Sequence, residues 1–195
     1  AQYLPQISMV KKDTEQSHLV LGFQGICRTD PRYPSFRLLS SILGGGMSSR
    51  LFQQVREKRG LVYSNYSFYD ALHDDGLFGI YAGTSPEHLD ELMPVVLDEI
   101  KGVMDRITPE ELARSKAQIK AGVLMSREST LTRADQQARY ILNFGRPFDV
   151  EKLVAGMDAV TGADITALAQ EIFRTTPTLA MIGDAGGLMS YDDIK

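Results

Sequence analysis

Two segments of alternating apolar and polar residues, 62–69 and 77–81, flank the polar turn sequence HDDG at 73–76. Strands joined by so short a turn lie side by side and antiparallel, so this part of the chain predicts a β-hairpin. The alternating segment 17–25 predicts a further strand, and the short apolar run 178–182 predicts another. The chain is therefore expected to build an antiparallel sheet, and its other segments must cover that sheet.

Helical periodicity and helix-start residues account for most of the remaining chain. Pro34 suits the first turn of a helix that stops at the glycine run 44–46, and Ser48 or Ser49 can cap a second helix that stops at Gly60. Further helices are expected from Ser85-Pro86, from the capping-box sequence Thr108-Pro109-Glu110-Glu111, over 131–142 up to Gly145, from about Asp149 and from about Thr161. Helices on one face of an antiparallel sheet make an α+β domain, and no linker-like composition divides residues 1–195.

Charge and cysteine content exclude several classes of protein. The net charge of −4 argues against nonspecific binding of nucleic acid, and the basic cluster at 50–59 is too short for a polyanion-binding tract. The lone Cys27 excludes a disulfide framework and a thiolate zinc cluster. No apolar run approaches the roughly 20 residues that span a bilayer, so no membrane partner is expected. One cysteine and no recognisable leader favour a cytoplasmic location, with the periplasm and the mitochondrial matrix as alternatives.

Two motifs suggest chemistry that their residues do not support. The glycine run precedes a helix, as phosphate-binding loops do, but it lacks the Gly-Lys-Ser/Thr ending and follows a helix rather than a strand. The sequence HLDEL at 88–92 resembles His-x-x-Glu-His, a zinc motif that needs two imidazoles on one helical face. Leu92 stands where the second imidazole is required, and neither of the other histidines has ligand spacing with His88. By itself the chain is expected to bind no catalytic zinc.

The stretch 43–63, LGGGMSSRLFQQVREKRGLVY, resembles the C-terminal domain of the pitrilysin/insulinase family of zinc peptidases nearly letter for letter. It is most similar to the processing-peptidase branch, which has bacterial members. The resemblance continues through the hairpin, the helix start at 83–87 and the helix start at 108–112. It implies one half of a clamshell, in which the N-terminal half holds zinc and the C-terminal half supplies an Arg and a Tyr seven residues apart. Arg56 and Tyr63 match that pair.

The resemblance implies that the chain is the C-terminal, substrate-binding half of a zinc metalloendopeptidase that cleaves peptides or unfolded protein segments. Its zinc would be held by an N-terminal half, on the same polypeptide or a separate chain, and a dimer is compatible with this scheme. The residues alone allow simpler explanations, because cations favour a helix C-terminus and Tyr63 could be a half-buried strand aromatic. Arg59 shares a turn with Arg56, but the family spacing to Tyr63 selects Arg56. A non-catalytic family member that acts as a structural or substrate-presenting subunit, and an unrelated α+β interaction module, remain alternatives.

Overall fold

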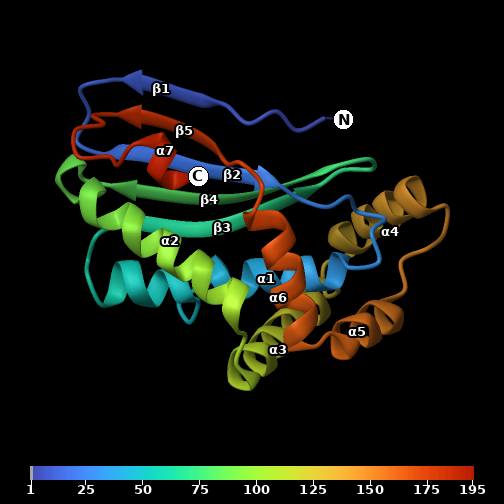
Figure 1. The fold of residues 1–195 in the computed structure, drawn as a ribbon. Helices are drawn as coiled ribbons and strands as arrows, with labels where there is room; N and C mark the ends of the chain where they lie inside the picture. Colours follow the sequence, from blue (N-terminus) through green and yellow to red (C-terminus); the bar gives the residue numbers. More distant parts are fainter. Residues whose placement is uncertain (1) are drawn as a thin grey trace.

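A five-stranded sheet with the order β1-β5-β2-β4-β3 forms one layer of the computed structural model, which describes residues 2–195 (Figure 1). The strands are β1 (Ile7–Lys11), β2 (Ser17–Gln24), β3 (Ser64–Ala71), β4 (Gly76–Thr84) and β5 (Thr178–Gly183). The predicted hairpin is formed by β3 and β4, and β2 pairs antiparallel with both β4 and β5. Among the described strands only β1 pairs in parallel, with β5. The predicted antiparallel sheet therefore has one parallel edge.

Helices cover one face of the sheet (Figure 1). They are α1 (Tyr33–Gly44), α2 (Leu89–Asp105), α3 (Pro109–Ser126), α4 (Thr130–Phe144), α5 (Val150–Ala159), α6 (Gly162–Phe173) and α7 (Tyr191–Ile194), with a π-helix η1 (Phe52–Glu57) and a 3₁₀ turn η2 (Pro86–His88). Alternate strand residues such as Leu19, Leu21 and Ile80 are buried against this layer. The buried side chains of the sheet and helices form one cluster. The α+β architecture with helices on one face is confirmed.

The helix boundaries follow the capping residues of the sequence. The Thr108 hydroxyl accepts a hydrogen bond from the Glu111 N–H at 3.2 Å, and the Glu111 carboxylate accepts one from the Thr108 N–H at 2.9 Å. This reciprocal pair closes the predicted capping box of α3. Thr161 and Asp164 form the same arrangement at the start of α6. Gly145, with φ of 65°, ends α4 in the left-handed conformation that favours glycine.

Thr108→Ala is expected to lower the free energy of unfolding by about 1 kcal/mol, because the Glu111 N–H in the first turn of α3 loses its hydroxyl acceptor. Urea unfolding followed by circular dichroism would measure the change. Thr132→Ala is the matched control, since the Thr132 hydroxyl bonds to no described residue and alanine is a good helix former. Equal stability of wild type and Thr108→Ala would contradict the capping role.

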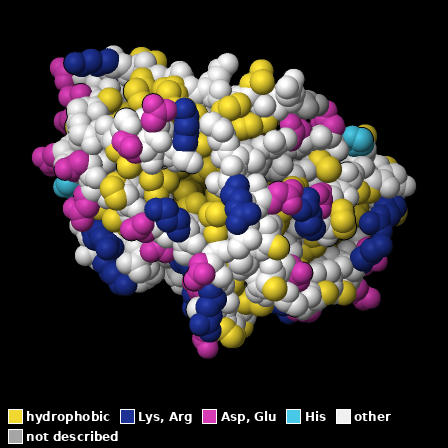
Figure 2. Space-filling view, viewed as in Figure 1, with side chains coloured by type: hydrophobic (Ala, Val, Ile, Leu, Met, Phe, Trp, Pro, Cys, Tyr) yellow, Lys and Arg dark blue, Asp and Glu magenta, His cyan; other side chains and the backbone are white. Residues whose placement is uncertain are grey.

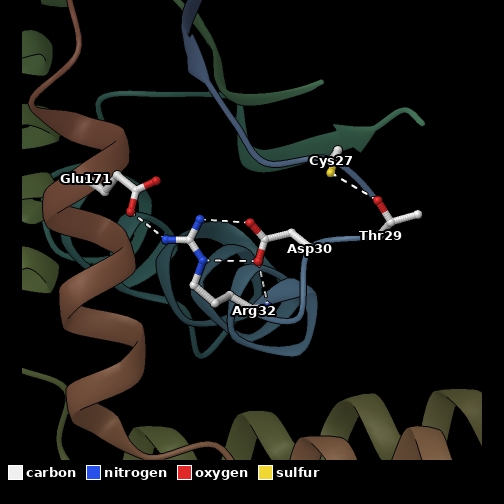
Figure 3. A network of polar contacts seen from close by, with 5 residues as sticks. All are labelled: Cys27, Thr29, Asp30, Arg32 and Glu171. Atoms are coloured by element: carbon white, nitrogen blue, oxygen red, sulfur yellow. Dashed lines mark hydrogen bonds and ion pairs between the residues drawn. The ribbon is translucent and has the colours of Figure 1, made fainter. Parts of the chain in front are cut away.

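A polar network joins the loop between β2 and α1 to α6 (Figure 3). The Arg32 guanidinium donates to both carboxylate oxygens of Asp30, at 3.0 and 2.8 Å, and to Glu171 at 2.5 Å. The hydrogen bond from Arg32 lowers the pKa of Asp30. The Arg32 side chain is 45% exposed, so the network fixes the loop without adding much stability. Cys27 is half-buried just after β2, with its Sγ 3.3 Å from the Thr29 hydroxyl.

The surface shows no continuous basic tract on the face drawn in Figure 2, where Lys and Arg side chains are interspersed with Asp and Glu. Salt bridges on the described surface include the pairs Lys120–Asp158 and Arg139–Asp135. Within residues 2–195, no helix combines the length and the apolar character needed to cross a membrane.

Candidate active-site surface

Arg56 lies on η1, which follows the glycine run and differs from the predicted helix in its hydrogen bonds. The Lys58 N–H bonds to the Gln53 carbonyl, five residues back, which is the bonding pattern of a π-helix. The prediction that Ser48 or Ser49 caps this helix is wrong. The Ser49 hydroxyl instead donates to the Gly46 carbonyl at 2.6 Å, and no side chain caps the first turn of η1. Single turns of π-helix occur often at functional sites.

The glycine run has two separate structural roles. A Cβ on Gly44 would lie 2.2 Å from the Ser67 backbone nitrogen, so glycine at this position lets the end of α1 approach β3 directly. Gly46 has φ of 148°, a conformation that side chains disfavour, and it redirects the chain from α1 toward η1. Gly46 thus forms the bend between α1 and η1, while Gly44 allows α1 to pack closely against β3.

Arg50 anchors the start of the η1 segment to α3. Its Nε and Nη2 donate to the two carboxylate oxygens of Glu111 at 2.7 and 2.9 Å, and Nη2 also donates to the Arg106 carbonyl. The side chains of Arg50 and Glu111 are only 15% and 16% exposed. Burial raises the pKa of Glu111, but the hydrogen bonds from Arg50 and Thr108 outweigh it and lower that pKa overall. This ion pair was not predicted from the sequence, in which Arg50 is one of several basic residues at 50–59 and Glu111 is distant.

The Gly60 turn carries the chain from η1 to β3 and positions Tyr63. Gly60 has φ of 65°, and its N–H bonds to the Arg56 carbonyl at 3.0 Å, as in the αL motif that ends many helices. The Leu61 N–H bonds to the Val55 carbonyl, six residues back. The Tyr63 N–H then bonds to the Gly83 carbonyl at 2.9 Å. The Tyr63 phenol is held 3.1 Å from the Ser85 hydroxyl, yet the residue is 57% exposed. Tyr63 is therefore an exposed aromatic on a fixed backbone, not a half-buried one.

Arg56 and Arg59 differ in the use of their guanidinium donors. Arg59 Nη1 donates to both the backbone and side-chain oxygens of Gln54, and its Nε lies 3.8 Å from Glu91. The Arg56 guanidinium lies 5.1 Å from the centre of the Phe52 ring and makes no hydrogen bond or ion pair with any described residue. A cation–π contact of this kind orients the guanidinium without occupying its N–H groups. Arg56 therefore presents unused donors to solvent.

The histidines of this chain do not form a zinc site. Leu92, at the position where the second imidazole of a zinc motif would be needed, is fully buried in the core. His18 shares a hydrogen bond with the Tyr81 hydroxyl at 2.8 Å, and His88 lies 4.0 Å from Glu87. Within residues 2–195, no three His, Cys, Asp or Glu side chains are grouped so as to hold a metal ion. The donor set of this chain does not fit catalytic zinc.

The model of the peptidase M16 inactive domain matches residues 2–119, which are more than half of the chain. The chain belongs to the M16 peptidase family. A curated relative from Streptomyces coelicolor, named an uncharacterized zinc protease, is 36% identical over 179 residues, which are 91% of this chain and 39% of that protein. The uncharacterized zinc protease YmxG of Bacillus subtilis is 36% identical over 92% of this chain and 44% of its own length.

The fold of the M16 chain is also found in a solved structure, the peptidase M16 inactive domain from Pseudomonas fluorescens. The two superpose with a TM-score of 0.82 at 25% identity, over 95% of this chain and 45% of the other. The chain thus spans less than half the length of the relatives that it matches. The family resemblance carried by the 43–63 stretch is confirmed.

Proposed function

We propose that this chain is the substrate-binding, C-terminal half of a zinc metalloendopeptidase that acts on peptides or unfolded protein segments. The relatives that are named zinc proteases are more than twice as long as the matched region, which leaves room for a zinc-binding half. That half would supply the metal chemistry, as part of the same polypeptide or as a separate chain. The proposed role of this chain is to bind the substrate and to stabilise charge on it.

The observation that supports this role most directly is the availability of two hydrogen-bond donors at Arg56 and Tyr63. When water adds to a peptide carbonyl, negative charge develops on the oxygen, and donors aimed at that oxygen lower the barrier. The Tyr63 phenol can donate its proton to the oxygen while it accepts a hydrogen bond from Ser85. The unpaired guanidinium of Arg56 can hold a second substrate oxygen.

The proposal is tested by combining this chain with the N-terminal half and zinc. The pair is expected to cleave an unstructured fluorogenic peptide much faster than the N-terminal half alone, because the substrate-side donors complete the site. Steady-state kinetics with equal amounts of zinc-loaded N-terminal half measure the gain. Equal rates with and without this chain would reject a catalytic contribution.

The alternative function is that of a non-catalytic structural or substrate-presenting subunit. The description of the matching domain as inactive accords with the missing metal ligands and fits either function. The two functions differ in what they demand of Arg56 and Tyr63. A presenting subunit needs them only for binding, so their substitution would change KM and leave kcat unchanged.

A further inference from the structure

An open cleft lies between α1, α3, α4 and β3, away from Arg56 and Tyr63. Its volume is about 430 Å³, within the range of sites for small ligands. The side chains that line it include Arg37, Ser41, Gln118 and Gln136, together with apolar Ile119 and Val123. No Asp or Glu is among the described residues that line the cleft. Its only formal charge is therefore the positive charge of Arg37.

The guanidinium of Arg37 has no partner among the described residues. Its Nε is buried without a hydrogen-bond acceptor, and no described carboxylate forms an ion pair with it. The residue as a whole is half-buried in the middle of α1. The terminal nitrogens Nη1 and Nη2 are not among the buried unpaired atoms, so only the Nε–H is withdrawn from water without a hydrogen bond. A half-buried guanidinium that bonds to no described residue has donors available for an acceptor from outside the chain.

The neighbouring arginines show that the missing partner is specific to Arg37. A smaller cavity of about 130 Å³ borders Arg37 and is also lined by Arg28 and Arg139. Arg28 Nε donates to the Ala71 carbonyl at 2.9 Å, and Arg139 Nε donates to Asp135 at 2.8 Å. Both of these arginines thus have acceptors within the protein, while Arg37 has none.

The other polar groups of the cleft suit an oxyanion. The Gln136 amide donates to the Ser126 hydroxyl at 3.1 Å, and the Gln118 amide donates to the Gly45 carbonyl at 3.1 Å. Each amide has a second N–H, which these bonds do not use. The Ser41 hydroxyl, one turn from Arg37 on α1, forms no hydrogen bond with a described residue. A carboxylate with a short apolar body would match both the Arg37 edge and the Ile119 and Val123 side chains.

We propose that the cleft between α1, α3 and α4 is a binding site for a carboxylate, which pairs with the terminal nitrogens of the Arg37 guanidinium. Two sources of the carboxylate share this chemistry: a free small carboxylic acid and an acidic side chain of a peptide. The site goes beyond the proposed peptidase function, because it contains neither of the residues proposed to act on the scissile bond.

The test is a titration of the 195-residue chain at constant ionic strength, followed by amide chemical shifts in NMR spectra. Succinate represents the free acid, and the acetylated and amidated peptide Ala-Glu-Ala represents the acidic side chain. At least one probe is expected to shift the amides of Arg37, Ser41 and Gln136 saturably, and the tighter probe identifies the source. The amidated peptide Ala-Gln-Ala, which lacks the charge, is expected to cause no saturable shift.

Arg37→Gln is expected to weaken binding at least about tenfold, because a charge-assisted hydrogen bond is lost. Arg174→Gln removes an exposed arginine that has no ion pair among the described residues, and it should leave the affinity unchanged. Circular dichroism checks that both variants are folded, and the wild-type titration is decisive even if Arg37→Gln does not fold. The proposal is overturned if neither carboxylate binds wild type, or if the shifts map to other residues.

Discussion

Tyr63→Phe, made in the complete two-half protein, is expected to lower kcat by roughly 100- to 1000-fold, the usual effect of losing one donor to a developing oxyanion. The phenol is fixed by the Tyr63 N–H bond to Gly83 and by the contact with Ser85, so phenylalanine fits the same space without its hydroxyl. Zinc content should not change, because no metal ligand is altered. Steady-state kinetics with metal analysis of the same samples measure both quantities.

Arg56→Ala is expected to lower kcat/KM by a similar factor, while Arg59→Ala serves as its matched control. Arg59 lies three residues later and has its donors engaged by Gln54 and Glu91, so its removal should change activity less than about threefold. A larger loss with Arg59→Ala than with Arg56→Ala would show that the family spacing selects the wrong arginine. An unchanged kcat in Tyr63→Phe would favour the substrate-presenting alternative.

Arg50→Met is expected to lower the free energy of unfolding by about 3–5 kcal/mol, because it leaves the carboxylate of Glu111 buried without its cation. Chemical unfolding at pH 7 measures the loss. The exposed pair of Asp98 and Lys101, each 75% exposed, supplies the control, and Lys101→Ala should change stability by less than about 0.5 kcal/mol. A loss below about 1 kcal/mol in Arg50→Met would contradict the anchoring role.

The same ion pair predicts a pH dependence with a definite sign. The pKa of Glu111 is lowered in the folded protein from its ordinary value of 4.5, so the unfolded chain takes up the proton first as pH falls. The stabilisation by the carboxylate is therefore complete above about pH 4.5 and is lost as pH falls through the lower, folded pKa. The stability difference between wild type and Arg50→Met should shrink over that interval.

The secondary-structure elements that could be predicted from the sequence are those marked by local turn residues, capping residues or apolar periodicity. The hairpin and the capped helices α3 and α6 are examples, since turn and cap chemistry acts within a few residues. The strand β1 was missed because all five of its residues are exposed, so no alternation marks it, and its partner β5 lies about 170 residues away. The apolar residues of α4 did predict a helix, but Leu131 and Leu142 are 79% and 83% exposed rather than part of the core.

For the candidate site, the sequence predicted which residues belong to it and how far apart they lie in the chain, but not the local structure that holds them. The family resemblance selected Arg56 and Tyr63, and their catalytic roles stay a prediction. The π-helical turn was not foreseeable, because helical periodicity does not distinguish bonds to the fourth residue from bonds to the fifth. The Arg50–Glu111 anchor joins residues 61 positions apart, and no local pattern reports such a contact. The sequence also could not predict that Arg37 is unpaired, because this depends on which side chains the fold brings near its Nε.

The place of β5 in the sheet links the order of synthesis to the order of folding. β5 lies between β1 and β2, so a growing chain that has not yet reached residue 183 has no partner for β1 and leaves one edge of β2 open. Such unpaired edges can pair with other chains, and contacts between distant segments form slowly. The sheet can close only after the β5 segment, Thr178–Gly183, has left the ribosome. During that interval, a nascent copy is most vulnerable to joining a neighbouring one through the edge that β5 later covers.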